Sequence, residues 1–496
     1  MNFLEAGVQG WAIVLTWPNL AYPVVGTLLA MLAAFLPGLS GVTVMAMALP
    51  LTLAWEPIPA LLFFAALVGG GTFMGSVTAI LFNVPGSSPS AATLIDGYPM
   101  ARNGEARTAI ACSAAASALG STFGIVILVL LLPWVRSLLL SFGPPEFLML
   151  TIWGLATVAM LGRGNWLKGM AAAGIGLLLA MIGRDPQTAE DRYTLGLDYL
   201  QEGLTVIPVL LGLFAITETI ELMASQRTSI AGELEPGAMR GSIREGIAAV
   251  WRNLGLFLRS SAIGTIIGAI PGVGGTVASF VAYGHAVQSS PDPERFGKGD
   301  VRGVLAPEAA HDAKDGGSLL PVLAFGIPGS EGTVMLLVLF EQHGIVPGRE
   351  LMSAHLPLVF ALIWALFLSN WLTSLVGLAV SGPLARITVL RTQILAPIIL
   401  CLAAVGAIAT RGPLGDLLVA AAFGVFGYLM RRHGWPRVPL AIGFVLGRPF
   451  ETNLLLTLRL QELGRIDLLD RPIVLALALL ILGTLLLPAW RMRKAG

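Results

Sequence analysis

The stretch Pro37-Gly38-Leu39-Ser40-Gly41 interrupts a long apolar region, and a related stretch, Pro271-Gly272-Val273-Gly274-Gly275, does the same in the second half. Each has a companion downstream: Asn83-Val84-Pro85-Gly86-Ser87-Ser88 follows the first, and Gly326-Ile327-Pro328-Gly329-Ser330-Glu331 follows the second. The offset is 234 residues from Pro37 to Pro271 and 243 residues from Pro85 to Pro328. In a chain of 496 residues, these offsets predict an internal duplication.

The chemistry of these loops points to a transport site. Pro and Gly interrupt a helix, and the freed backbone groups are tolerated at membrane depth only where they line a cavity or pack within protein. Paired broken helices in matching positions of two halves are typical of the substrate site of a secondary transporter. The alternative is four helix kinks without a ligand. A kink needs one Pro, however, and these loops add Gly, Ser or Thr each time.

The composition places the chain in a membrane. It is 55% hydrophobic and 12% charged, with a mean hydropathy of +0.81, whereas about a quarter of the residues in a soluble domain are charged. Long apolar runs without alternation exclude an outer-membrane barrel. We therefore expect an all-α polytopic membrane protein with about ten to twelve transmembrane helices plus re-entrant or broken ones. The clearest apolar runs are 108–132, 204–223, 356–380 and 473–487.

Several function classes are disfavoured. The net charge of +1 gives no preference for nucleic acid, and no phosphate-binding Gly-x-x-x-x-Gly-Lys-Ser/Thr loop occurs. Cys112 and Cys401 lie far apart in apolar sequence, as core residues do. Hydrolase and metalloprotease motifs are missing, so we expect no catalytic residue, no metal and no organic cofactor. The alternatives are a binding-protein-independent anion channel or exporter, or an intramembrane enzyme.

The charge distribution suggests how the halves are oriented. No Lys or Arg precedes Arg102, whereas several arginines lead into the second loop. The positive-inside rule places that lead-in, and the basic C-terminus, in the cytoplasm and the N-terminus outside, as in two inverted-topology repeats. We expect a first repeat over residues 1–224, a cytoplasmic connector over 225–260 and a second repeat over 261–496. The end of the connector, 239–258, fits either an amphipathic helix on the inner leaflet or a plain connector.

The broken helices should hold an organic anion. A helix N-terminus offers unpaired N–H groups and partial positive charge, and Gly lets the backbone approach a ligand. The loop-bearing segments lack Lys and Arg, so helix dipoles and hydroxyls are favoured over an arginine clamp. The candidate substrate-binding residues are Pro37, Gly38, Ser40, Gly41, Thr43, Asn83, Pro85, Gly86, Ser87, Ser88, Pro271, Gly272, Gly274, Gly275, Thr276, Pro328, Gly329 and Ser330.

Ionisable residues near the loops are candidates for the coupling ion or a proton relay, because acids within a membrane are costly and usually functional. Pro307 and Gly316 predict a short helix over 307–315, whose residues Glu308, His311, Asp312 and Asp315 share one face. The alternative is a solvated interfacial helix. Glu331 fits either a relay or a solvated helix cap. Glu218 and Glu221 are expected at the membrane interface, and residues 96–100 are expected to form a turn.

These motifs resemble the large membrane subunit of the tripartite tricarboxylate transporters, the TctA family. The resemblance covers nearly the whole chain. Its motifs are residues 36–41, 83–93, 96–102, 268–275, 306–310 and 326–330.

The resemblance implies a multi-pass protein of the bacterial inner (cytoplasmic) membrane. Its partners would be a small four-helix membrane subunit, a periplasmic solute-binding protein and a carboxylate substrate, in a lipid bilayer and without nucleic acid. It also implies symport of di- or tricarboxylates with Na⁺ or H⁺ as coupling ion. One departure stands out: the family typically has two asparagines where this chain has His311-Asp312. The substrate or coupling ion could differ accordingly.

Overall fold

The structure is a computed structural model that describes residues 2–36, 39–160, 166–185, 188–224, 239–384, 392–410 and 414–495. Apart from a short antiparallel hairpin of β1 (Gly183–Arg184) and β2 (Asp191–Arg192), the regular elements described are helices. Up to residue 224 they are α1 (Phe3–Leu15), α2 (Ala21–Phe35), α3 (Gly41–Thr52), α4 (Pro57–Gly70), α5 (Thr72–Phe82), α6 (Ser90–Arg102), α7 (Ala106–Leu139), α8 (Pro144–Met160), α9 (Trp166–Ala180), α10 (Asp198–Gln201), α11 (Val206–Leu210), the π-helical η1 (Leu211–Ile216) and α12 (Thr217–Ala224). From residue 239 they are α13 (Ile243–Arg252), α14 (Leu254–Ala269), α15 (Gly274–Gln288), the 3₁₀ turn η2 (Pro293–Arg295), α16 (Val301–Phe325), α17 (Glu331–Gln342), α18 (Arg349–Ala354), α19 (Leu356–Leu384), α20 (Thr392–Ile408), α21 (Gly415–Arg432), α22 (Arg437–Glu462) and α23 (Pro472–Ala495).

Helix lengths confirm an all-α polytopic membrane protein. Within the described ranges, four helical stretches are long and apolar enough to cross a bilayer: Pro57–Phe82, Ala106–Leu139, Val206–Ala224 and Leu356–Pro383. Shorter apolar helices accompany them, and two of these, Ala21–Phe35 and Leu254–Ala269, end at the Pro-Gly loops. The number of crossings stays a prediction.

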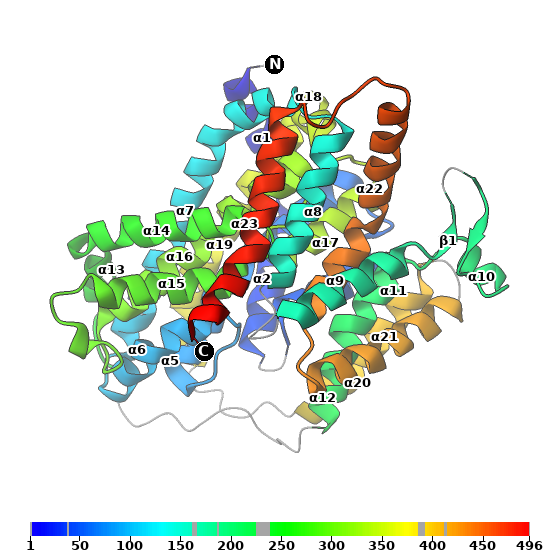
Figure 1. Ribbon diagram of the computed structural model, residues 1–496. Helices are drawn as coiled ribbons and strands as arrows, with labels where there is room; N and C mark the ends of the chain where they lie inside the picture. The colour runs from blue at the N-terminus through cyan, green and yellow to red at the C-terminus, as the bar shows by residue number, and fades with distance from the viewer. Residues whose placement is uncertain are drawn as a thin grey trace.

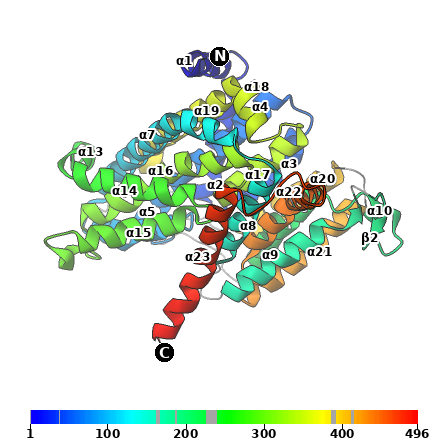
Figure 2. The ribbon, with the colours of Figure 1, turned by 45° about the horizontal axis from the view of Figure 1, so that its top comes forward.

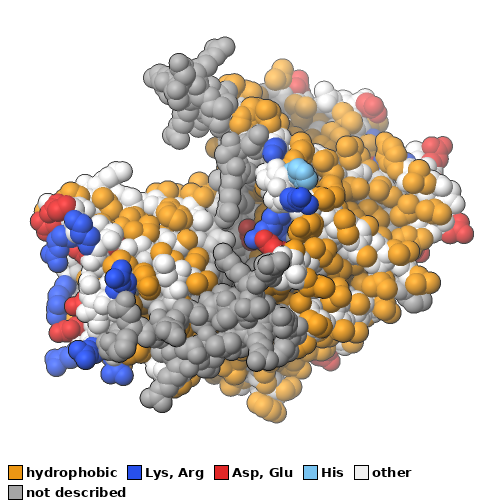
Figure 3. Space-filling model, turned by 90° about the horizontal axis from the view of Figure 1, so that it is seen from below, with side chains coloured by type: hydrophobic (Ala, Val, Ile, Leu, Met, Phe, Trp, Pro, Cys, Tyr) orange, Lys and Arg blue, Asp and Glu red, His pale blue; other side chains and the backbone are white. Residues whose placement is uncertain are grey.

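Large hydrophobic side chains cover much of the outer surface. On α20 and α21, for example, Val405 is 59% exposed and Leu418 is 66% exposed. Figure 3 shows a broad hydrophobic area on one face of the molecule, with Lys and Arg side chains gathered near one edge. A soluble monomer rarely exposes so extensive an apolar surface to water. These helix faces are therefore suited to contact lipid.

Each side of the molecule combines helices from both halves of the chain. Figures 1 and 2 show α13, α14, α15 and α16 on one side together with α5, while α9, α20 and α21 lie on the opposite side. Helices α2, α8 and α17 lie between the two groups. The Pro-Gly loops belong to this middle region and to the α14–α16 group, so residues far apart in sequence meet there.

Helix α16 is held between α7 and α14 by very close backbone contacts. A Cβ atom on Gly124 of α7 would lie 2.2 Å from the Ala313 carbonyl oxygen, and one on Gly264 of α14 would lie 2.1 Å from the Ala310 carbonyl oxygen. A Cβ on Gly316 of α16 itself would lie 2.2 Å from the carbonyl carbon of Gly124. Small residues allow such close helix crossings in membranes. The path of α16 is thus fixed by glycines on three helices.

We expect Gly264→Ala to lower the thermal unfolding midpoint of the purified protein by several degrees, because the new methyl group would push apart two backbones. Overpacking of this kind costs about 1–3 kcal/mol. Gly284→Ala in α15 is the matched control, since no atom lies within 4 Å of the added Cβ. Alanine favours a helix over glycine by up to about 1 kcal/mol, so Gly284→Ala should leave the midpoint unchanged or raise it. Equal midpoints for the two variants would contradict the close packing.

The start of α16 is fastened to α6 by a buried carboxylate. Asp96 Oδ1 accepts hydrogen bonds from the backbone N–H groups of Gly299 and Asp300, both at 2.9 Å, and Oδ2 accepts one from the Tyr283 hydroxyl at 2.9 Å. The turn predicted for residues 96–100 is therefore wrong, because these residues belong to α6.

Burial alone would raise the pKa of Asp300, but hydrogen bonds from Arg302 and its positive charge hold that pKa below its ordinary value. Asp300 thereby serves as a charged N-cap of α16.

The end of the predicted connector forms α13, a short amphipathic helix. Ser242 caps it by accepting a hydrogen bond from the Glu245 N–H. One face packs against α7, where a Cβ on Gly246 would lie 2.4 Å from the Thr108 carbonyl oxygen. The other face exposes apolar side chains, including Trp251, which is 61% exposed. Residues 225–238 lie outside the described ranges, so the domain boundaries stay a prediction.

Candidate transport site

The Pro-Gly loops separate helices through matching backbone conformations. Leu36 follows α2 with φ −82° and ψ 105°, and Ile270 follows α14 with φ −84° and ψ 118°. Both conformations are extended and end the helix. In the second loop Gly272 and Gly274 have φ of +75° and +70°, which L residues other than Gly rarely adopt. Pro37 and Gly38 of the first loop lie outside the described residues.

The companion loops match even more closely. The C-cap of α5 is Asn83, with φ 56°, and the C-cap of α16 is Gly326, with φ 65°. Asn and Gly are the residues that most readily adopt this left-handed conformation. A Cβ on Gly86 would lie 2.7 Å from Cα of Gly75, and a Cβ on Gly329 would lie 2.8 Å from Cα of Ser318. In both halves the loop glycine contacts a residue of the preceding helix at the same separation in sequence, as expected of duplicated sequence.

The loops of one half meet the companions of the other half. A Cβ on Gly275 would lie 3.0 Å from His311 Cδ2 and Lys314 Cε, and 3.2 Å from Cγ of Pro89. We call this meeting place the Lys314 junction: the N-termini of α15 and α6, with Gly275, Pro89, His311 and Lys314. Its two loops also contain other candidate residues: Pro271, Gly272, Gly274, Thr276, Asn83, Pro85, Gly86, Ser87 and Ser88.

The second meeting place joins α3 and α17. A Cβ on Gly332 would lie 3.5 Å from Met45 Sδ of α3. We call it the Glu218 junction: the N-termini of α3 and α17, with Ser40, Thr43, Glu218, Glu331 and Arg437. Its two loops also contain the candidate residues Gly41, Pro328, Gly329 and Ser330.

At the Glu218 junction, the N-terminus of α3 already holds a carboxylate of this chain. Glu218 is 7% exposed, and its Oε2 accepts hydrogen bonds from the Ser40 N–H, at 3.2 Å, and from the Thr43 hydroxyl. The Ser40 hydroxyl also accepts from the Thr43 N–H, at 3.2 Å. Glu218 is therefore buried in protein, and its position relative to the membrane interface stays a prediction. Sequence reasoning missed this contact because its partners are separated by 175 residues.

Arg437 completes the Glu218 junction. Its Nη1 donates a hydrogen bond to the Leu213 carbonyl at 2.7 Å, and its guanidinium carbon lies 5.6 Å from the centre of the Phe214 ring. Its positive charge is close enough to Glu218 and Glu331 to interact with both carboxylates. Glu331 stands in the first turn of α17, which Ser330 caps. An acid there is favoured by the helix dipole, and its relay role stays a prediction.

The Lys314 junction has the opposite charge character. The N-termini of α6 and α15 have no side-chain cap and no acidic residue in their first turns. Lys314, 7% exposed, brings a positive charge beside them and pairs with the neighbouring Asp315. Two helix N-termini and a buried ammonium together favour an anion. The loop segments themselves lack Lys and Arg, and the position of Lys314 along the chain does not show that α16 packs against them.

The helix predicted over 307–315 is wrong in its bounds and in its solvated form. Helix α16 begins at Val301, where Asp300 caps it, and continues to Phe325, with Pro307 and Gly316 inside. Gly316 does not end the helix because it serves the close contact with α7. Glu308, His311 and Asp312 are 0%, 2% and 1% exposed, so this face is buried in protein. Their role as relay or ion ligands stays a prediction.

Glu308 is surrounded by hydroxyl groups from three helices. Its Oε1 accepts hydrogen bonds from Ser76 of α5, at 2.6 Å, and from Thr93 of α6. Its Oε2 accepts from Ser113 and Ser117 of α7, at 2.7 and 3.0 Å. Four hydroxyl groups thus serve both carboxyl oxygens, which is how a buried polar group is tolerated. None of these hydroxyls was singled out from the sequence, because they lie in apolar helices far from Glu308 in the chain.

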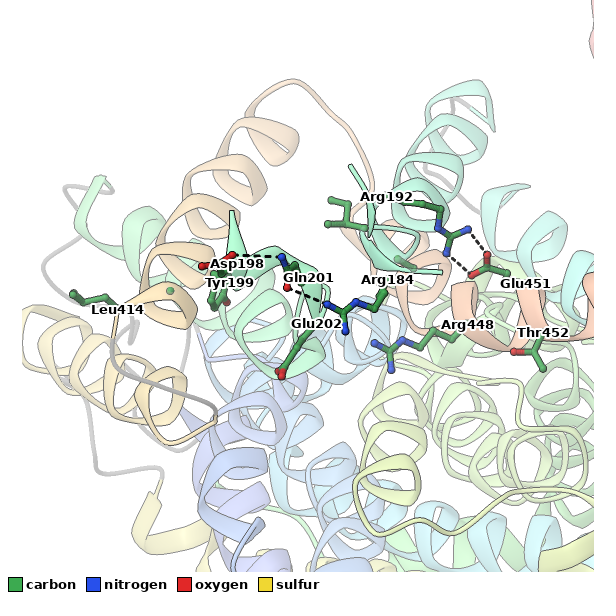
Figure 4. A pocket seen from close by; sticks show the side chains of 13 residues that line it. Arg184, Arg192, Asp198, Tyr199, Gln201, Glu202, Leu414, Arg448, Glu451 and Thr452 are labelled. Atoms are coloured by element: carbon green, nitrogen blue, oxygen red, sulfur yellow. Dashed lines mark hydrogen bonds and ion pairs between the residues drawn. The ribbon is translucent and has the colours of Figure 1, made fainter. Parts of the chain in front are cut away.

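A cavity of about 800 Å³ lies away from both junctions, between the β1–β2 hairpin, α10 and α22. Figure 4 shows Arg184, Arg192 and Arg448 among its lining residues, with Arg192 paired to Glu451 and Arg184 hydrogen-bonded to Gln201. Its lining includes three arginines and also three acids, Asp198, Glu202 and Glu451. These formal charges cancel, and none of the sequence-predicted site residues lines the cavity.

Comparison with known proteins identifies the family. The chain matches the model of the Tripartite tricarboxylate transporter TctA family over residues 20–442. The chain belongs to the TctA family. It is 31% identical over 504 residues, 100% of this chain and 98% of the relative, to "Uncharacterized 52.8 kDa protein in TAR-I ttuC' 3'region" of Agrobacterium vitis. It is also 28% identical over 234 residues, 47% of this chain and 97% of the relative, to "Uncharacterized protein in TAR-II ttuC' 3'region" of the same organism. No solved structure matches it.

Membership in the TctA family confirms the resemblance drawn from the sequence motifs. It makes this chain a membrane component of a tripartite tricarboxylate transporter. The matched range, residues 20–442, includes all four loops and every named residue of both junctions, from Pro37 to Arg437.

Proposed function

We propose that this chain is a secondary active transporter that imports organic anions, di- or tricarboxylates or related carboxylates, in symport with Na⁺ or H⁺. A substrate carboxylate binds at the Lys314 junction. The observation that carries this proposal is the contrast between the two junctions. Glu218 and Glu331 supply negative charge to the N-termini of α3 and α17, whereas the N-termini of α6 and α15 face Lys314 without an acid in their first turns.

The arrangement of the helices supports an inverted-topology repeat as the basis of this site. A Cβ on Gly10 of α1 would lie 2.8 Å from the Pro357 carbonyl oxygen of α19, and one on Gly246 of α13 would lie 2.4 Å from the Thr108 carbonyl oxygen of α7. Helix α1 of the first repeat thus packs against the long helix α19 of the second, and α13 of the connector packs against the long helix α7 of the first. This exchange, with the matched loops, is what two halves related by a pseudo-two-fold axis would produce.

The proposed partners follow from the family. The chain works in the bacterial inner membrane with a small four-helix membrane subunit, and a periplasmic solute-binding protein delivers the carboxylate. Substrate specificity then depends on both the binding protein and the Lys314 junction.

The test is uptake of labelled organic acids by cells that lack their own carboxylate carriers. The cells express this chain with its small subunit, with and without the binding protein, in Na⁺ or Na⁺-free buffer. We expect saturable uptake that requires the binding protein. Unsaturated flux without it would indicate a channel, and no uptake of any acid by a properly inserted complex would overturn the substrate class.

A further inference from the structure

The buried face of α16 carries more acidic than basic side chains. Glu308, Asp312 and Asp315 are acids, His311 and Lys314 are bases, and each is at most 7% exposed. Lys314 pairs with Asp315. Within the part of the chain that the structure describes, no ion pair joins a base to Glu308 or Asp312. Buried charges are tolerated when they are paired or hydrogen-bonded.

The two remaining acids differ in how they are satisfied. Glu308 receives four hydroxyl donors. Asp312 does not: its Oδ1 is buried and has no hydrogen-bond partner. The side chains of Thr72 of α5 and Ser117 of α7 lie beside the Asp312 carboxylate. Ser121, one turn beyond Ser117 on the same face of α7, also has a buried hydroxyl without a partner.

Carboxylate and hydroxyl oxygens gathered in a dry interior are the ligands that hard cations prefer. We propose that Asp312 binds a monovalent cation of the size of Na⁺, with hydroxyl oxygens of Thr72, Ser117 and Ser121 as further ligands and the hydroxyl-bound carboxyl group of Glu308 beside it. This inference rests on the proposed function, in which the cation is the coupling ion.

The placement would link the cation to the substrate through one helix. Glu308 and Asp312 are four residues apart and face α5 and α7. His311 and Lys314 are three residues apart and face Gly275 of α15. A cation on the first face lowers the negative charge of α16, and an anion then binds more easily beside Lys314 on the second face.

The experiment measures thermal unfolding of the purified full-length protein in detergent without any organic acid. NaCl is compared with KCl and choline chloride at equal ionic strength. We expect saturating Na⁺ to raise the midpoint by roughly 3–8 °C relative to choline. Asp312→Asn should lose this shift. Asp416→Asn is the matched control, because Asp416 is a buried carboxylate of α21 hydrogen-bonded to Thr205, away from α16; it should keep the shift.

Should Asp312→Asn yield too little folded protein, Ser117→Ala replaces it, and the Na⁺ concentration for a half-maximal shift should rise at least several-fold. Equal midpoints in Na⁺ and choline for the unmodified protein, or an unchanged shift in Asp312→Asn, would overturn the cation site. So would a midpoint that responds to pH but not to Na⁺, which would make Asp312 a proton acceptor. Uptake of organic acid by a protein without a cation-specific shift would overturn this site and leave the transport function standing.

Discussion

Glu308→Leu is expected to lower the free energy of unfolding by about 2–4 kcal/mol. The substitution removes the acceptor of four buried hydroxyls, those of Ser76, Thr93, Ser113 and Ser117. Serine and threonine hydroxyls in helices can turn to a carbonyl of their own helix, which limits the loss. The links between α5, α6, α7 and α16 would nevertheless be broken. Thermal or SDS-induced unfolding followed by circular dichroism measures the effect.

Two variants control for this result. Glu308→Gln keeps one carbonyl oxygen as acceptor and adds an amide that can donate to hydroxyl oxygens, so it should cost less than Glu308→Leu. Glu350→Leu removes an exposed glutamate of α18, and surface substitutions usually stay within about 0.5 kcal/mol. If Glu308→Leu were as stable as Glu350→Leu, the hydroxyl network would not stabilise the fold.

The fold class and the four interruptions could be predicted from the sequence because both depend on local chemistry. Apolar runs of spanning length require a membrane whatever they pack against. The effect of Pro and Gly on the backbone is equally local: α5 and α16 do end with the C-caps Asn83 and Gly326, and the chain is extended at Ile270. Matched spacing was therefore enough to find matched loops.

The extent of α16 could not be predicted in the same way. Pro307 and Gly316 commonly mark helix ends, yet both lie inside this helix. In a membrane interior a glycine often serves a close helix crossing, as Gly316 does against Gly124. Only the position of α7 shows which role applies, and that position is not encoded in the spacing of residues along α16.

The electrostatic difference between the junctions was also out of reach of the sequence. It depends on contacts between distant segments: Glu218 with Thr43, and Lys314 with the loop at Gly275. The loops themselves have similar compositions, and both were predicted to bind substrate. The charges that distinguish them come from α12, α16, α17 and α22.

Lys314→Met is expected to reduce the initial rate of uptake by about 30-fold or more. Removing one partner of a buried charge pair typically costs 2–5 kcal/mol of binding, about 30-fold to several thousand-fold. Methionine keeps a side chain of similar length and loses only the ammonium group. The N-termini of α6 and α15 would remain, but their partial charges alone are weaker than a full positive charge within the protein. Uptake is normalised to the amount of protein in the membrane.

Lys314→Met also leaves Asp315 without its ion-pair partner, so a loss of uptake alone could reflect misfolding. The double variant Lys314→Met/Asp315→Asn separates the two effects, because it removes both charges of the pair and restores a neutral contact. It should recover the unfolding midpoint of the parent protein and still fail in uptake. Lys168→Met, which removes an ammonium of α9 that donates to the His433 carbonyl at 2.6 Å, should transport normally. A double variant with near-parental uptake would contradict the assignment of the substrate carboxylate to Lys314, because no ammonium would then be needed beside the two helix N-termini.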